Sequence, residues 1–247
     1  MRRYLLGLIL LLIAASMFLT ACKDENNPTD PEDALWAVIL TKNDDVKDDV
    51  YDIMISWVGT GTYEEPESLE LEIEGEDIAL ESWQDIWFGS ANLLAGQQYN
   101  IKLMIDGDVQ CDANLRIVYP VTGSFPEFYN PTMSSTMTWS LYDDNEEQVA
   151  SLSSVNMENI WEDDDYYETS QLSPSARSFT FPANAVDDFG TATQFTMDIT
   201  QLNVNTVNDV MLMSGHSAYQ SYGYGSKQER GRTQILNHYR KLINQYR

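Results

Sequence analysis

Brief apolar runs of strand length, separated by acidic or glycine-containing turns, constrain this chain more than any other feature. Their β-branched and aromatic content is typical of strands, and many short strands at regular spacing favour a sandwich. The first group is 36–41, 50–58, 68–73, 85–89, 98–106 and 108–119, and the second is 136–141, 148–155, 177–181, 193–200 and 209–214. Because a proline-rich break follows Tyr119, the sequence predicts an all-β fold with two tandem β-sandwiches, at 34–120 and 121–214.

Alternation of apolar and polar residues indicates which side of a strand is buried. Phe195, Met197 and Ile199 alternate with polar residues, as expected of a half-buried strand. The same parity places Cys111 on a buried face, with Val109, Ala113, Leu115 and Ile117. We therefore expect Cys111 to be an inert buried thiol.

The segment from Leu94 to Tyr99 resembles the corner that enters strand F of fibronectin type III and related immunoglobulin-like domains. In that family a tyrosine returns its hydroxyl to upstream backbone, which assigns this role to Tyr99, and Trp57 would be the core tryptophan. The segment departs from the fibronectin pattern at Ala95, where proline is usual. Further along, Asp106-Gly107-Asp108 suits a tight hairpin and offers too few oxygen ligands for calcium.

The N-terminus carries Arg2 and Arg3, an apolar run at 5–13, and then Leu19-Thr20-Ala21-Cys22. This pattern resembles the lipobox of bacterial lipoproteins, which implies a signal peptide at 1–21, lipidation of Cys22 and a polar tether at 22–33. An uncleaved membrane helix or an ordinary secretory peptide is the alternative. Lys23-Asp24-Glu25 resembles the surface-export signal of Bacteroidetes lipoproteins. Together the resemblances imply a lipid anchor in the cell envelope, at the outer membrane, with display on the cell surface.

Charge limits the partners of the folded body. Between Lys23 and Ser226 the chain has six basic and 38 acidic residues, a net charge of −32. Such a field repels phosphate groups, so nucleic acid and anionic lipid are excluded as partners of this part.

The C-terminal part, 215–247, has the opposite charge. Residues 214–226 are rich in Gly, Ser and Tyr, which predicts a flexible connector. Beyond it, apolar residues recur at helical spacing and basic residues take the other side, which predicts an amphipathic helix; the apolar set is Ile235, Leu236, Tyr239, Leu242, Ile243 and Tyr246. Opposite charge favours docking of this tail on the acidic sandwiches or on a subunit, over contact with another partner or with anionic lipid.

The sequence offers little for catalysis. His216 and His238 stand apart, no nucleophile or nucleotide motif is found, and we expect no metal or cofactor. The alternative is a carboxylate-dependent glycan hydrolase, because Glu70, Glu72 and Glu74 share one face of a strand at acid–base spacing. In so acidic a protein, such a row more often faces solvent.

Binding has better support. Aromatic rings stack on sugars and carboxylates accept hydroxyl hydrogens. One region combines both groups, and its candidate ligand-binding residues are Trp161, Asp163, Asp164, Asp165, Tyr166 and Tyr167. A second aromatic cluster lies at 82–88. In both regions the rings could instead cover their own cores, and calcium binding by the acidic residues of the first region is a further alternative. The sequence thus predicts a non-enzymatic binding or structural module, with a glycan or a protein as its ligand.

Overall fold

The computed structural model describes residues 36–42, 49–59, 63, 65–83, 85–142, 147–158 and 165–223, without the side chains of 165–168. Within these ranges the elements are strands and one short 3₁₀ helix, η2 (Gly190–Ala192). None of the helices there is long and apolar enough to cross a membrane. The predicted C-terminal helix lies outside the described residues.

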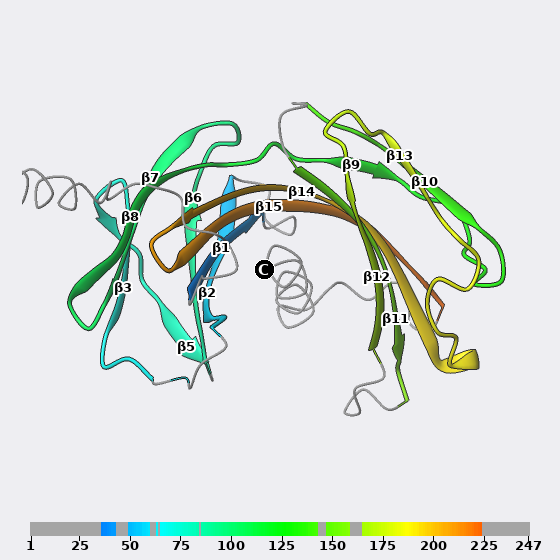
Figure 1. The fold of residues 1–247 in the computed structure, drawn as a ribbon, viewed down its shortest axis with the longest axis horizontal. Coiled ribbons are helices and arrows are strands. Elements are labelled where there is room, and N and C mark those ends of the chain that lie inside the picture. Colours follow the sequence, from blue (N-terminus) through cyan, green and yellow to red (C-terminus); the bar gives the residue numbers. More distant parts are fainter. Residues whose placement is uncertain are drawn as a thin grey trace, which may run out of the picture.

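The fifteen strands of the described ranges form three sheets (Figure 1). The largest has eight strands in the order β12-β11-β14-β15-β1-β2-β6-β5, and the smaller ones have the orders β4-β3-β7-β8 and β13-β10-β9. The strands of the first half are β1 (Trp36–Lys42), β2 (Val50–Trp57), β3 (Leu69–Ile73), β4 (Glu76–Asp77), β5 (Glu81–Trp83), β6 (Ile86–Asn92), β7 (Gln98–Ile105) and β8 (Asp108–Arg116). Those of the second half are β9 (Thr122–Ser124), β10 (Ser135–Ser140), β11 (Glu147–Asn156), β12 (Asp165–Leu172), β13 (Ser178–Phe181), β14 (Thr193–Val207) and β15 (Val210–Gly223).

The first half has the strand order of an immunoglobulin-like sandwich. Strands β1-β2-β6-β5 correspond to strands A, B, E and D, while β3-β7-β8 correspond to C, F and G. Strand β4 adds to the outer edge of the second group. This order confirms the predicted sandwich class from hydrogen-bond pairing alone.

The second half repeats the same plan. Strands β9, β10 and β13 pair as A, B and E, and β12-β11-β14-β15 take the places of C′, C, F and G. The apolar sides of β10 and β14 are buried: Met137 and Trp139 on β10, and Phe195, Met197 and Ile199 on β14. The prediction that β14 is only half-buried is wrong, because Asp198 and Thr200 on its other side are also buried. Two sandwiches are therefore present, as the sequence predicts.

The sandwiches are joined more closely than a tandem arrangement predicts. Strand β15 pairs in parallel with β1, from Trp36 opposite Val210 to Thr41 opposite Gly215. One sheet thus continues from the second sandwich into the first, and the long hairpin β14–β15 arches across both (Figure 1). The prediction of a flexible connector from residue 214 is wrong for residues 214–223, because these residues belong to β15.

Side chains of the long hairpin bind the edge of β8 in the first sandwich. Asn203, Asn205 and Asn208 donate their Nδ2 amides to the backbone oxygens of Arg116, Asn114 and Gln110, at 2.9, 3.0 and 3.1 Å. The hydroxyl of Ser214 also donates to the Arg116 oxygen, at 2.7 Å. An exposed strand edge leaves backbone groups unpaired, and these contacts pair it with the second sandwich.

Opposite faces of the eight-stranded sheet hold different apolar clusters. The outer face packs on the two small sheets, with Leu212 and Ile53 in the first core and Met197 and Leu152 in the second. The inner face, concave in Figure 1, holds a third cluster, all of it from the large sheet: Ala37, Ile39, Met54, Ile86, Val149, Leu202, Met211 and Met213.

Several local predictions can be compared with the structure. The hydroxyl of Tyr99 accepts the backbone N–H of Leu94 at 2.9 Å, as the family resemblance implies. Asp106 and Gly107 form the predicted hairpin, both with positive φ (53° and 82°), which suits a type I′ turn. Cys111 is fully buried, and burial raises the pKa of its thiol to about 12.

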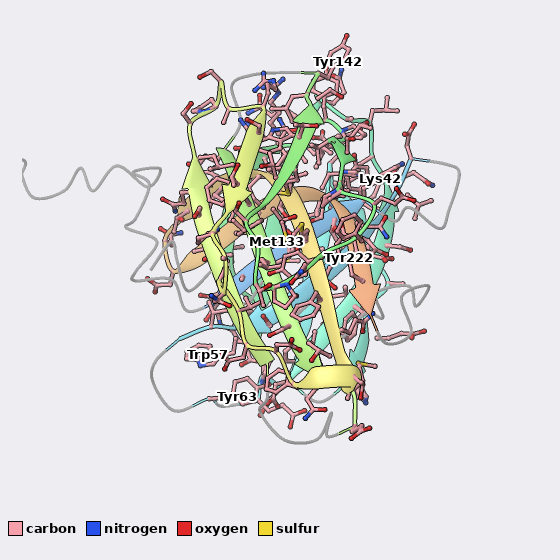
Figure 2. All side chains as sticks on the ribbon, turned by 90° about the vertical axis from the view of Figure 1, so that its right-hand side faces the viewer. Lys42, Trp57, Tyr63, Met133, Tyr142 and Tyr222 are labelled. Atoms are coloured by element: carbon pink, nitrogen blue, oxygen red, sulfur yellow. The ribbon has the colours of Figure 1, made fainter. Side chains whose placement is uncertain are left out.

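Two predictions about the first core are wrong. Val109 is exposed, because a register shift between Leu103 and Met104 lets Gln110 bulge and reverses the parity before Cys111. Trp57 is only partly buried and lies at the end of the molecule beside Tyr63 (Figure 2). The more deeply buried indole is that of Trp36, whose ring meets Trp57 edge-on at 5.5 Å.

Candidate functional site

The ligand-binding residues expected from the sequence are divided by the structure. Trp161, Asp163 and Asp164 lie outside the described residues. Asp165, Tyr166 and Tyr167 begin β12, where their backbones pair with Val155, Ser154 and Ser153. Strand β12 is the edge strand of the eight-stranded sheet at this end. The role of Asp165, Tyr166 and Tyr167 in binding stays a prediction.

The row of glutamates that suggested a hydrolase does not form a catalytic pair. Leu71 and Ile73 point into the core, so the glutamates between them face outward. The Glu72 carboxylate binds the Lys102 ammonium at 3.0 Å. Glu74 lies in a turn with φ of 54°, and its Oε1 accepts the N–H of Asn100. Glu74 and Glu76 line a cavity of about 390 Å³, and Glu72 is not among the residues that line it. An acid and a base would face the same groove.

The second aromatic cluster contains both core and surface rings. Trp87 packs on Trp36, with ring centroids 5.7 Å apart, and so covers the first core. Trp83 is 52% exposed on edge strand β5, and it lines a cavity of about 260 Å³ with Glu81, Ser82 and Phe88. This cavity presents a single carboxylate and a hydroxyl to a ligand.

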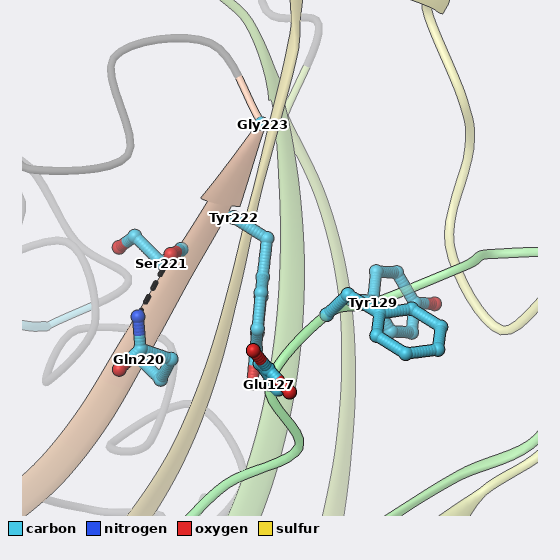
Figure 3. A pocket seen from close by; sticks show the side chains of 7 residues that line it. Glu127, Tyr129, Gln220, Ser221, Tyr222 and Gly223 are labelled. Carbon is cyan, nitrogen blue, oxygen red and sulfur yellow. Dashed lines mark hydrogen bonds between the residues drawn. The ribbon is translucent and has the colours of Figure 1, made fainter.

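A larger cavity, which we call the β15 cleft, lies where β15 ends (Figure 3). Its volume is about 420 Å³, within the range of sites for small ligands. Residues 127–129, from the irregular segment between β9 and β10, form one side, and residues 220–223 of β15 form the other.

Two tyrosines fix the floor of the β15 cleft. The hydroxyl of Tyr222 donates to the backbone oxygen of Pro126 at 2.9 Å, which holds the irregular segment against β15. The Tyr129 ring packs edge-on against Phe195 at 4.9 Å and lies 6.0 Å from the Tyr222 ring. Burial raises the pKa of Tyr222 to about 12, and burial followed by the charge of Asp188 raises that of Tyr129. Both hydroxyls therefore remain neutral.

Gly223, the last residue of β15, lines one end of the β15 cleft. Its φ of +91° is unfavourable for other residues, and an added Cβ would lie 2.3 Å from the backbone oxygen of Thr193. Only glycine lets β15 end so close to the start of β14.

Three exposed side chains give the β15 cleft its chemistry. The ring of Phe128 is 75% exposed, and the Glu127 carboxylate and Gln220 carboxamide are exposed beside it. An exposed ring offers an apolar plane, while the carboxylate accepts and the amide both donates and accepts hydrogen bonds. Such a combination suits a neutral, hydroxyl-rich ligand.

Sequence reasoning did not find this cleft. Phe128 and Glu127 lie in the proline-rich break, and Gln220 lies in the segment that was predicted to be a connector. An exposed aromatic residue in a break is a weak signal by itself, because only the fold brings residues 127–129 to the end of β15. Elsewhere in the described ranges, no group of three or more His, Cys, Asp or Glu side chains could hold a metal ion.

Comparison with known proteins supplies no family. No protein-family model matches the sequence, and no curated protein sequence matches it. Among solved structures, the chain is similar to the central fibronectin-III array of RIM-binding protein, with 12% identity, a TM-score of 0.24, and coverage of 75% of this chain and 68% of that one. It is also similar to the FN1-FN3 domains of chicken CNTN1, with 11% identity, a TM-score of 0.26, and coverage of 81% and 68%.

A third similarity is to the fibronectin(III)-like modules of Clostridium thermocellum CbhA, with 11% identity, a TM-score of 0.23, and coverage of 78% of this chain and 93% of that one. These TM-scores are low, so the fold assignment comes from the strand pairing described above.

Proposed function

We propose that this chain is a non-enzymatic binding module of the cell envelope, anchored by a lipid on Cys22, that holds a glycan in the β15 cleft. The observation that carries the proposal is the ring of Phe128, 75% exposed at the rim of a cavity that also presents Glu127 and Gln220. A ring at the rim of a cavity, with hydrogen-bonding groups beside it, is suited to stacking on a sugar face.

Charge disfavours an anionic ligand. The folded body is strongly acidic, and Glu127 adds a further negative charge at the cleft. Phosphorylated or sulfated ligands would be repelled, whereas sugar hydroxyls donate well to a carboxylate. The rigid floor, held by the bond from Tyr222 to Pro126, limits the entropy that binding would cost.

The test uses the soluble chain Lys23–Arg247, which contains every described residue, on a glycan array followed by calorimetry with the best ligand. We expect Phe128→Ala to weaken binding about tenfold, since an aromatic contact contributes about 0.5–1.5 kcal/mol beyond its buried area. Glu127→Gln keeps the shape of the side chain and should also weaken binding. The matched control is Tyr142→Ala, which removes another highly exposed ring, 79% exposed, that does not line the cleft.

The outcomes separate the two candidate sites. Loss of binding in Trp161→Ala with unchanged binding in Phe128→Ala would move the site to the residues expected from the sequence. Absence of any glycan ligand, or equal affinity of the Phe128→Ala and wild-type chains, would overturn the proposal. The anchor is tested separately, because radiolabelled palmitate should enter the full chain and should fail to enter Cys22→Ser.

A further inference from the structure

The inner face of the eight-stranded sheet is as well buried as a protein core. Its eight apolar residues, named above, are each between 0 and 3% exposed. Polar residues of the same face are buried with them, including Ser151, Asp198 and Thr200 at 0 to 1%. The register places all of these on one side, because Val149 lies opposite Thr200, and Ser151 opposite Asp198.

A sheet face is buried to this degree only when a second layer of structure packs against it. The two small sheets already cover the outer face. All apolar residues that belong to the inner cluster or pack on it, Val58, Phe88 and Val204 among them, come from the strands of the large sheet or the turn after β2. The described part of the chain thus provides no second layer here.

The sequence that follows β15 has the properties of such a layer. Residues 224–247 follow Gly223, the last residue of β15, in the sequence. Ile235, Leu242 and the other apolar residues of the tail recur at helical spacing and give one apolar side. Twelve residues, from 235 to 246, make a helix about 18 Å long. The six strands that carry the inner cluster, β11 to β6, span about 24 Å at ordinary spacing.

The segment between β15 and the predicted helix is long enough to reach the inner face of the sheet. Residues 224–232 can span about 30 Å when extended, which exceeds the width of the cluster. The apolar side of the tail can therefore reach the centre of the face from the end of β15.

Charge favours the same arrangement. Register assigns Asp52, Glu81, Glu147 and Asp198 to the inner face, and none of the described Lys or Arg residues lies on it. The tail carries six basic residues and one acidic residue, for a net charge of +5. Basic side chains that flank an apolar helix face would lie near these carboxylates, and a tethered segment meets them at high local concentration.

We propose that residues 233–247 dock as an amphipathic helix on the inner face of the eight-stranded sheet of their own chain, with Leu242 and its apolar neighbours against Met54, Met211 and Met213. The basic tail is then the second layer of the sheet, not a probe for lipid or for another protein. This proposal is independent of the β15 cleft.

Methionine oxidation tests the docking directly, because oxidation by peroxide requires access to the sulfur. Met54, Met211 and Met213 lie on the inner face, while Met137 and Met197 lie in the second core and Met133 is 60% exposed. Peptide mass spectrometry of the full soluble chain reports each site. We expect Leu242→Asp to raise the oxidation rates of the three inner-face methionines severalfold, toward that of Met133, and to leave Met137 and Met197 protected.

The matched control is Asn244→Asp, which adds the same charge on the polar side of the helix. It should leave every oxidation rate at the wild-type value. Unchanged protection of the inner-face methionines in Leu242→Asp would overturn the proposal.

A second measurement does not depend on how well Leu242→Asp folds. A benzophenone amino acid at position 239, on the apolar side, should cross-link within its own chain to the strands that carry Met54, Met211 and Met213. The same probe at position 240, on the basic side, should give severalfold fewer of these cross-links. Mixing light and isotopically heavy chains distinguishes the occupants: cross-links only between chains would show a second copy, and none to the inner face would show another cover. Either result would refute docking within the chain.

Discussion

The amide side chains that join the long hairpin to β8 predict a measurable coupling between the sandwiches. The change is the double substitution Asn203→Ala and Asn205→Ala, which removes hydrogen bonds of 2.9 and 3.0 Å to the backbone oxygens of Arg116 and Asn114. Both asparagines are partly exposed and are polar, so truncating them should leave the apolar cores unchanged. Only the connection between the sandwiches is weakened.

The loss of stability depends on which hydrogen bonds the two backbone oxygens keep after the double substitution. The Arg116 oxygen keeps the Ser214 hydroxyl at 2.7 Å, and water can reach the oxygen of the exposed Asn114. Neither acceptor is left buried and unpaired, so each bond is worth the lower part of the usual range, about 0.5–1 kcal/mol. The double substitution should lower the free energy of unfolding by about 1–2 kcal/mol, and Tm by roughly 2–8 °C for a chain of this size.

Urea and thermal unfolding, followed by tryptophan fluorescence and circular dichroism, give the assay. The transition should remain single, with an unchanged m-value and a lower midpoint. Asn92→Ala is the control, because this exposed side chain makes no hydrogen bond within the described ranges, and its substitution should have no measurable effect. A change below about 0.3 kcal/mol in the double variant would refute the view that these amides hold the sandwiches together.

Two further predictions concern single residues of the first sandwich. Tyr99→Phe removes the acceptor of the Leu94 N–H and should cost about 0.5–1.5 kcal/mol in urea unfolding, and a neutral result would show that water replaces the hydroxyl. Cys111 should resist thiol reagents at pH 8 in the folded chain and react fully in urea, whereas fast labelling under native conditions would contradict its burial. Folding raises the pKa of the Cys111 thiol from 9.0 to about 12, so the folded chain keeps this proton at pH values where the unfolded chain has lost it. The thiol's contribution to the free energy of unfolding is therefore complete below pH 9 and is lost as the pH rises toward 12. Cys111→Ala should remove this part of the pH dependence of unfolding.

Local signals in the sequence were sufficient for much of the fold. The burial of Phe195, Met197 and Ile199, the Asp106-Gly107 turn and the Tyr99 corner each depend on neighbouring residues, and the structure confirms all three. Such features are determined by side-chain period and turn geometry, which a single segment contains completely.

The predictions from sequence fail where the structure of a residue depends on a segment that is distant in the sequence. Residues 214–223 resemble a linker because they are small and polar, but Ser214 is small where β15 passes the backbone of β8, and Gly215 lies between Thr41 and Leu202 in the shared sheet. Parallel pairing of β1 with β15 joins opposite ends of the described chain, and no local pattern specifies it. The same reason hid the β15 cleft, whose two sides, at 127–129 and 220–223, are distant in sequence and meet only when the second sandwich has formed.

The two sandwiches share one continuous sheet, and hydrogen exchange of β1 and β15 tests this continuity most directly. Exchange would be measured residue by residue in increasing, subdenaturing urea, for 36–41 and 210–215 and for core amides such as Ile101 in β7 and Leu152 in β11. If the shared sheet makes the two sandwiches one cooperative unit, all of these amides converge on a single free energy and a single urea dependence. Exchange of the β1–β15 pair at a clearly lower free energy than the cores of both sandwiches, with a separate value for each sandwich, would contradict it.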